Sequence, residues 1–267
     1  MLRQRVITAL IIAPIVLALI FFTPGRLFAL VMLGLGLIGA WEWSALSGRP
    51  GRSSRLALVV LFGILAVAGG WLQSVQASDT VLLIYCLSAL VWWLFSLGWL
   101  AFWRIEFSFP VKVMCGALTL LPALAAVVSL HAVSPWYLVD LLLLTSAADI
   151  GAYFTGRAFG RHKLAPLVSP GKTWEGVVGG LVLVAVVAAI EDYWLPAELV
   201  PFVLLCMGVA LLSVVGDLSE SLFKRQAGLK DSGSLFPGHG GLLDRVDSLT
   251  AAAPLFWLGA RALGLLP

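Results

Sequence analysis

The sequence has little charge for its length, and this scarcity decides the broad class of protein. Only 12% of its 267 residues are Asp, Glu, Lys or Arg, whereas 61% are apolar. Soluble domains carry about 25% charged residues and about 45–50% apolar residues. The composition therefore excludes an ordinary soluble globular protein and predicts an integral membrane protein.

Cysteine and the common catalytic motifs are scarce as well. Cys86, Cys115 and Cys206 stand far apart in apolar segments, so neither a disulfide framework nor a zinc site is expected. The chain contains no Cys–His pair, no G-x-S-x-G sequence and no convincing internal repeat. Its chemistry must therefore come from its few charged residues.

Long apolar runs, in contrast, are abundant. A membrane-spanning helix needs about 20 apolar residues. We predict nine spans, at about 6–22, 27–46, 56–72, 81–103, 112–131, 136–155, 176–190, 199–216 and 248–266. The first run lacks a small-residue cleavage site, so it is predicted to be a retained span and not a signal peptide. The expected fold is all-α and polytopic, with about nine transmembrane helices.

The basic residues indicate the orientation. With the N-terminus inside, 15 of the 17 Lys and Arg fall in inside segments. Lys and Arg accumulate on the cytoplasmic side of membrane proteins, so a cytoplasmic N-terminus is predicted. The net charge of +3 thus reflects topology and does not indicate nucleic-acid binding.

The two parts of the chain differ in polar content. Residues 1–135 are predicted to form five N-terminal membrane helices with few ionisable groups. Residues 136–267 are predicted to form a catalytic membrane region of four spans with two polar cytoplasmic loops. Several tryptophans near span ends, among them Trp43, Trp92 and Trp136, are interpreted as an interfacial belt.

The first polar constellation lies in the sixth span. Asp149 stands inside the apolar run, where an ionisable residue is a functional candidate. Arg157 follows eight residues later, about two helical turns, and so shares its face. The alternative is a structural ion pair inside the bundle.

The second constellation, Ser169-Pro-Gly-Lys172-Thr173, leads into the seventh span. It is not a phosphate-binding P-loop, because Pro166 stands where that motif needs its first glycine. Backbone N–H groups at a helix start, with a lysine and hydroxyls, nevertheless favour an anion. The alternative is an ordinary cytoplasmic loop.

The third constellation runs from Asp217 to Asp247. If the eighth span continues as a helix, Asp217, Ser221 and Lys224 share one face. Asp244 and Asp247 stand on the first turn of the ninth span, so Asp217 and Asp244 are predicted to converge at the inside ends of consecutive spans. Meeting carboxylates repel unless they share a cation, and oxygen ligands suit Mg²⁺. The basic residues of the segment would face phosphate oxygens: Lys224, Arg225, Lys230 and Arg245. The alternative is a loop of paired surface charges.

Carboxylates, a metal, lysine and arginine together indicate phosphoryl or nucleotidyl transfer. The membrane setting predicts that one substrate is a lipid with a phosphate head. A CTP-dependent kinase of a membrane alcohol such as a polyprenol would use similar groups but release CDP. An anion transporter would show paired broken helices in two related halves, and no such symmetry is visible.

The third constellation also resembles the signature of the phosphatidate cytidylyltransferases, or CDP-diglyceride synthetases. The residues that carry the resemblance are Ser221, Lys224-Arg225, Lys230-Asp231 and Pro237-Gly-His239-Gly-Gly-Leu-Leu-Asp244-Arg245-Val-Asp247. Residues 149–161 and 169–176 resemble companion motifs of the family. The likeness covers residues 140–257 well, and residues 1–135 match in general character.

The resemblance implies a reaction and a setting. CTP and phosphatidic acid would give CDP-diacylglycerol and pyrophosphate in the bacterial inner membrane. It further implies Mg²⁺ with K⁺ as a second cation, a homodimer, and metal-binding aspartates at Asp217 and Asp244.

These expectations lead to a hypothesis for the individual residues. Asp217, Asp244 and Asp247 are the expected metal ligands, with Asp231, Lys224 and Arg225 beside them in catalysis. The expected contacts to CTP and phosphate are Ser169, Lys172, Arg157, Ser221, Lys230 and Arg245. His239 is interpreted as a turn residue near the phosphates and not as a base. Gly176-x-x-x-Gly180 allows close helix contact, either between subunits or within the chain.

Overall fold

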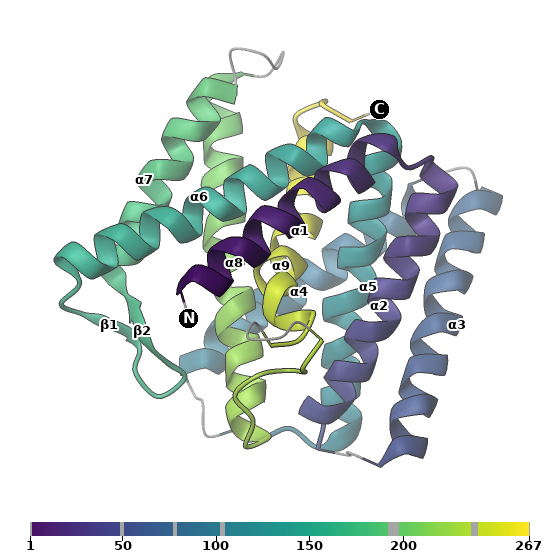
Figure 1. The fold of residues 1–267 in the computed structure, drawn as a ribbon. Coiled ribbons are helices and arrows are strands. Elements are labelled where there is room, and N and C mark those ends of the chain that lie inside the picture. The colour runs from purple at the N-terminus through teal and green to yellow at the C-terminus, as the bar shows by residue number, and fades with distance from the viewer. Residues whose placement is uncertain are drawn as a thin grey trace.

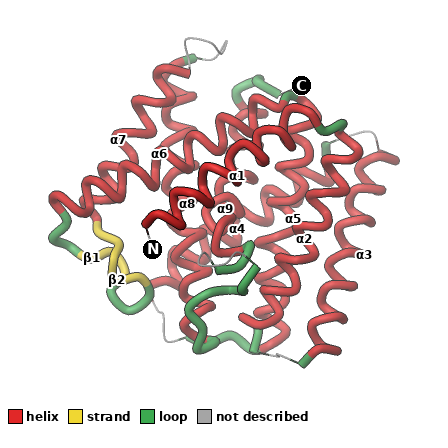
Figure 2. Tube along the Cα trace, viewed as in Figure 1, coloured by secondary structure: helices red, strands yellow, loops and turns green. Residues whose placement is uncertain are grey.

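The computed structural model describes residues 2–48, 51–76, 79–101, 105–191, 198–235 and 240–266. These contain nine helices and two short strands (Figures 1 and 2). The helices are α1 (Leu2–Phe22), α2 (Gly25–Leu46), α3 (Arg52–Gln76), α4 (Thr80–Ala101), α5 (Phe109–Val133), α6 (Pro135–Phe159), α7 (Trp174–Glu191), α8 (Leu199–Gln226) and α9 (Leu243–Ala262). Each predicted span falls largely within its own helix, so the all-α, polytopic fold is confirmed.

Seven of the nine helices, α2 to α8, are long and apolar enough to cross a membrane. In α1, the stretch with described side chains adds a shorter apolar segment, Ile12–Phe22. The first and ninth predicted spans are thus confirmed as helices, while their crossing of the bilayer stays a prediction.

The helices alternate in direction between two ends of the molecule (Figure 1). The connection from α5 to α6 and the end of α7 lie toward the upper end, with the C-terminus. The strands, the end of α8, the end of α2 and the start of α3 lie toward the lower end. Because most loop lysines and arginines belong to these lower segments, the charge asymmetry read from the sequence has a structural counterpart. Arg49 and Arg104 of that set lie outside the described residues.

Glycines bring α6 and α7 into close contact. A Cβ at Gly180 would lie 2.7 Å from the carbonyl oxygen of Ala148, and one at Gly176 would lie 2.9 Å from that of Ala152. Only glycine permits this backbone approach. The Gly176-x-x-x-Gly180 sequence therefore packs within the chain, against α6.

An aromatic cluster supports the lower part of α8. Trp92, Trp99 and Phe107 surround Phe223, with ring centroids 4.8 Å apart for Trp99 and Phe223. Trp43 and Trp92 are each only 5% exposed, and their indole nitrogens donate to buried oxygens. The interpretation of these two residues as interfacial was therefore wrong, although Trp136 is 63% exposed.

The polar loop after α6 forms a small antiparallel hairpin that the sequence analysis missed. Its strands are β1 (Lys163–Ala165) and β2 (Ser169–Thr173), with Lys163 opposite Thr173 and Ala165 opposite Ser169. The sequence did not predict these strands because the segment contains Pro166, Pro170 and Gly171, and proline and glycine are poor strand formers. The hairpin carries Lys172, and its second strand leads directly into α7 (Figure 2).

Candidate active site

α8 continues past its apolar part to Gln226, which places the first acidic and basic residues of the site on one rigid element. The Ser221 hydroxyl donates to Asp217 Oδ1 at 3.2 Å, and Lys224 Nζ donates to Glu220 Oε1 at 3.1 Å. These are i,i+4 pairs on the helix surface. The predicted shared face is confirmed for Asp217 and Ser221, whereas Lys224 bonds to Glu220.

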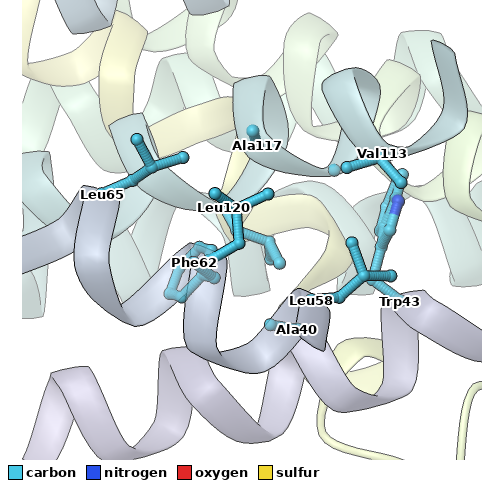
Figure 3. Close-up of a pocket in the computed structure, with 10 residues that line it drawn as sticks. Ala40, Trp43, Leu58, Phe62, Leu65, Val113, Ala117 and Leu120 are labelled. Atoms are coloured by element: carbon cyan, nitrogen blue, oxygen red, sulfur yellow. The ribbon is translucent and has the colours of Figure 1, made fainter. Parts of the chain in front are cut away.

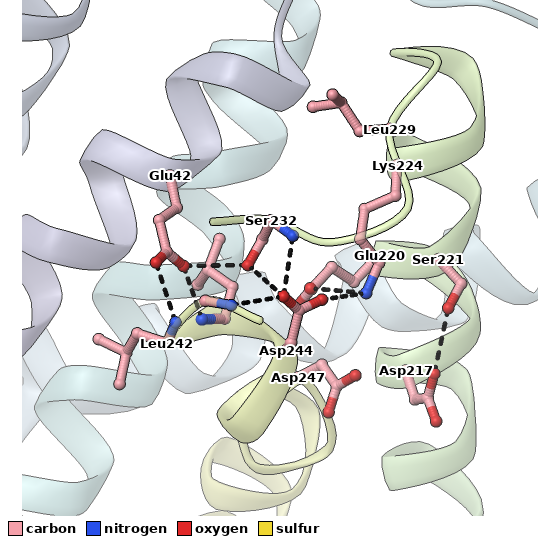
Figure 4. A network of polar contacts seen from close by, with 12 residues as sticks. Glu42, Asp217, Glu220, Ser221, Lys224, Leu229, Ser232, Leu242, Asp244 and Asp247 are labelled. Atoms are coloured by element: carbon pink, nitrogen blue, oxygen red, sulfur yellow. Dashed lines mark hydrogen bonds and ion pairs between the residues drawn. The ribbon is translucent and has the colours of Figure 1, made fainter. Parts of the chain in front are cut away.

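Asp244, on the first turn of α9, is held by four donors (Figure 4). Lys224 Nζ lies 2.7 Å from its Oδ1, while Oδ2 accepts the backbone N–H of Ser232 and of Gly241, each at 2.8 Å, and the Ser232 hydroxyl at 2.9 Å. Although burial opposes it, the hydrogen bonds from Lys224, Gly241 and Ser232 lower the pKa of Asp244. Asp244 is therefore held in a fixed position by the surrounding chain.

Asp217 has a more open environment. Lys172 Nζ, from β2, lies 2.7 Å from Asp217 Oδ2, and the two side chains are 25% and 27% exposed. Asp247 points toward Asp217 in Figure 4. Burial, followed by the negative charge of Asp217, raises the pKa of Asp247 to about 7. Asp149, on α6, lies within electrostatic reach of both Lys172 and Asp217. Lys172 thus pairs with Asp217, and the carboxyl groups of Asp149 and Asp247 lie within electrostatic reach of this pair.

The remaining predicted site residues are less closely grouped. Arg157 donates to the Tyr153 hydroxyl at 2.9 Å, one turn back along α6. Arg225 donates to the Leu229 carbonyl at 3.4 Å. The other described members are the half-buried Ser169, which opens β2, and the exposed Lys230, Asp231 and Arg245. His239 lies outside the described residues.

The start of α7 is capped by the chain itself. The Thr173 hydroxyl accepts the N–H of Gly176 at 3.1 Å. Glu175 accepts the His162 N–H and lies 2.6 Å from His162 Nδ1. Lys172 pairs with Asp217, so the binding of an anion at this helix start stays a prediction.

A sequence model described as the cytidylyltransferase family matches residues 3–263. The chain belongs to the cytidylyltransferase family. The resemblance predicted from the motif residues is thereby confirmed, and the match extends over the N-terminal helices as well.

Similar proteins in distant bacteria support this membership. The phosphatidate cytidylyltransferase of Pseudomonas aeruginosa is 43% identical over 272 residues, which cover 96% of each chain. That of Haemophilus influenzae is 39% identical, covering 96% of this chain and 97% of the relative. That of Staphylococcus haemolyticus is 32% identical, covering 95% and 96%.

The donor set of this family member suits a hard cation. Asp217 and the nearby carboxyl groups of Asp247 and Asp149 supply oxygen ligands close to Lys172. Within the described ranges, no three metal-ligating side chains are close enough to hold a metal by themselves. Mg²⁺ is commonly held by one or two carboxylates together with substrate phosphates. The residues fit such a cation, and the ligand assignment of Asp217, Asp244 and Asp247 stays a prediction.

Two residues outside the predicted set belong to the site. Glu220 pairs with Lys224. The sequence feature that indicated it is its position three residues after Asp217, which places the two acids close together on a helix. Glu42, on α2, accepts hydrogen bonds from Ser232 and from the start of α9 (Figure 4). Its signal was an ionisable residue inside a predicted span, the criterion that drew attention to Asp149.

An apolar cleft among α2, α3 and α5 is unrelated to this site (Figure 3). Its volume is about 30 Å³, and Trp43, Phe62 and Leu120 are among its lining residues. Sites for small molecules span about 300–1,000 Å³ and carry convergent polar groups. The cleft is therefore a packing gap.

Proposed function

We propose that this chain transfers the cytidylyl group of CTP to phosphatidic acid, giving CDP-diacylglycerol and pyrophosphate for phospholipid biosynthesis. The observation that carries the proposal is the cluster of carboxylates and lysines where α8, α9 and the hairpin meet. This cluster lies in a chain that matches the family over residues 3–263. The names of the relatives supply the lipid substrate.

The reaction balances without a nucleophile from the protein. A phosphate oxygen of phosphatidic acid forms a bond to the α-phosphorus of CTP. The bond from that phosphorus to the oxygen bridging to the β-phosphorus breaks, and pyrophosphate leaves with the electron pair. Phosphate monoesters have a second pKa of about 6, so the attacking group is largely deprotonated and needs no general base.

The two lysines have different roles. Lys224 is enclosed by Glu220 and Asp244, so it serves to hold Asp244. Lys172 makes one partly exposed ion pair with Asp217, and it can exchange that partner for a phosphate oxygen of the substrate. The other expected phosphate contacts are the exposed residues Arg157, Lys230 and Arg245 and the hydroxyls of Ser169 and Ser221.

Asp217, Asp247 and Asp244 are the residues that would hold Mg²⁺. When bound, Mg²⁺ supplies neutralisation of the negative charge that builds on the triphosphate. K⁺ is proposed as a second cation on the strength of the family resemblance. The role of this chain's own residues is to place the acids together at one end of the helix bundle and to orient the lysines.

The charged end of the bundle is proposed to face the cytoplasm, with the N-terminus on the same side, in the bacterial inner membrane. The support is the bias of Lys and Arg toward the inside segments, 15 of 17. A homodimer is proposed from the family resemblance. Light scattering of the detergent-solubilised protein, corrected for bound detergent, measures its mass directly.

A labelling experiment tests the reaction. Purified protein is incubated with phosphatidic acid, Mg²⁺ and CTP that carries ³²P on the α-phosphate, and the lipids are then extracted. We expect label in the organic phase, release of pyrophosphate, and loss of both on addition of a chelator. CTP labelled on the γ-phosphate is the matched control and should leave the lipid unlabelled. Label from the γ-phosphate in the lipid would indicate a kinase and overturn the proposal, as would no lipid label from either nucleotide.

A further inference from the structure

Glu42 is a buried carboxylate in the N-terminal part of the chain, and its side chain is bound by residues about 200 positions later. It is 5% exposed. Its Oε1 accepts the N–H of Leu242 at 2.9 Å, and its Oε2 accepts the N–H of Leu243 at 2.8 Å and the Ser232 hydroxyl at 3.0 Å. A buried charge is costly unless donors surround it. These three donors therefore explain how Glu42 is tolerated there.

Glu42 caps α9 from another helix. The first N–H groups of a helix have no partner within it, and the N-cap residue of α9, Leu242, supplies no side-chain hydrogen bond. A carboxylate at this position satisfies two of these donors and interacts favourably with the helix dipole. The location of the first turn of α9 thus depends on α2.

The same first turn carries Asp244. Three consecutive backbone amides are divided between two carboxylates: Gly241 donates to Asp244, while Leu242 and Leu243 donate to Glu42. The Ser232 hydroxyl lies between them, 3.0 Å from Glu42 and 2.9 Å from Asp244. Because a hydroxyl has one proton, it joins the two carboxylates through a single shared donor.

Two loop glycines leave room for the Glu42 carboxylate. A Cβ at Gly233 or at Gly241 would lie 2.5 Å from Glu42 Oε1. That distance is too short for a carbon–oxygen contact, so a side chain at either position would displace Glu42. The loop between α8 and α9 is therefore shaped around a residue of α2.

We propose that Glu42 is a positioning residue for the transfer reaction, acting through Ser232 and the start of α9 to fix Asp244 against Lys224. It reaches the site through these intermediaries and contacts neither substrate. The inference rests on the proposed function, because Asp244 matters for turnover only if the cluster is the active site.

The test is Glu42→Gln, which keeps the shape but replaces one accepting oxygen with an amide group that cannot accept an N–H. We expect kcat per folded molecule to fall about 10- to 100-fold, as for small misplacements of catalytic groups. KM for CTP should change much less, because Lys172 and Asp217 are untouched. His131→Gln is the matched control: His131 is 7% exposed and bonds to the Ile20 carbonyl, in a different part of the molecule. It should lower the melting temperature without lowering kcat.

Ser232→Ala provides a second variant in which the Glu42 bonds to α9 remain. It should lower kcat, and the double variant Glu42→Gln/Ser232→Ala should lose less than the product of the two single effects, since both break the connection between Glu42 and Ser232. Multiplicative losses would overturn the proposal. So would a Glu42→Gln protein that behaves like His131→Gln, less stable but with unchanged kcat. If Glu42→Gln does not fold, Ser232→Ala alone decides, and an unchanged kcat there overturns the proposal.

Hydrogen exchange separates this inference from the proposed function. Amide exchange at the start of α9 needs no substrate, and we expect it to be faster in Glu42→Gln than in His131→Gln. Unchanged exchange there overturns the inference whatever the activity. Absence of CDP-diacylglycerol formation by the unmodified chain would instead reject the proposed function, while faster exchange would still establish the cap.

Discussion

Asp217 lies in the last part of α8 and Asp244 on the first turn of the neighbouring α9, yet their surroundings differ. Asp244 and its partner Lys224 have side chains 7% and 8% exposed, and the Asp244 carboxylate accepts four hydrogen bonds. Asp217 and Lys172 have side chains 27% and 25% exposed, and the lysine arrives from a separate hairpin. One carboxylate is fixed by the fold, and the other is held by an exchangeable pair.

The difference suggests a division of labour. An acid that is fixed by the fold keeps its position through the reaction, which favours electrostatic stabilisation by preorganised groups. An acid paired with a partly exposed lysine can release that lysine to a phosphate. The region around Asp244 is therefore expected to respond to substitution in both stability and turnover, and the region around Asp217 in turnover.

The largest expected effect comes from removing each acid. Asp217→Asn and Asp244→Asn should each lower CDP-diacylglycerol formation about 10³-fold or more, as loss of a preorganised charge does. Only Asp244→Asn should also lower stability, by about 1–3 kcal/mol, because an amide cannot accept all four donors. Labelled CTP and thermal unfolding in detergent measure the two quantities. Near-normal turnover in either variant would refute the metal assignment.

Removing the buried lysine should lower stability as well as turnover. Lys224→Met leaves Glu220 and Asp244 without their common cation, at side-chain exposures of 6% and 7%. Breaking a buried pair in this way costs about 3–5 kcal/mol. A melting temperature equal to that of the unmodified protein would show that the two regions do not differ as described.

A substitution at the contact between α6 and α7 should disturb the hairpin and leave the start of α9 unchanged. In Gly180→Ala the new Cβ would lie 2.7 Å from the Ala148 carbonyl oxygen, and such overpacking costs about 1–3 kcal/mol. Gly70→Ala in α3 is the control, because a Cβ there meets nothing within 4 Å. We expect a lower melting temperature only for Gly180→Ala, with hydrogen exchange increased in the hairpin and unchanged at the start of α9.

The smallest expected effect is that of Lys172→Met. Stability should change by less than about 1 kcal/mol, because the ion pair with Asp217 is partly exposed. KM for CTP should rise about tenfold, because the variant loses the binding free energy of one charge-assisted hydrogen bond. A variant with unchanged KM but a much lower melting temperature would make Lys172 a structural partner of Asp217 and remove its proposed role.

The sequence predicted the architecture well where its signals are local. Nine apolar runs predicted nine helices, and the i,i+4 spacing predicted a shared helix face for Asp217 and Ser221, where the structure has a hydrogen bond between them. The motif from Ser221 to Asp247 predicted the family. Trp43 and Trp92 were assigned to the interface because sequence position cannot distinguish a tryptophan facing lipid from one facing another helix.

Other features depend on contacts between distant segments. The pairing of Lys172 with Asp217 joins β2 to α8, and the cap of Glu42 joins α2 to α9. The hairpin was not predicted because its strands contain proline and glycine. None of these has a local periodicity or a spacing that a single sequence displays.

By itself, then, the sequence determined that this is an all-α membrane protein and predicted which acids and bases carry its chemistry, because hydropathy, helical spacing and motif residues are properties of neighbouring positions. The tertiary structure decided that Asp244 is fixed by the fold while Asp217 is paired with a lysine that can exchange its partner. It also decided that Glu42 of α2 caps α9. The reason is physical: burial and hydrogen-bond partners depend on how helices pack, and packing brings together residues about 200 positions apart.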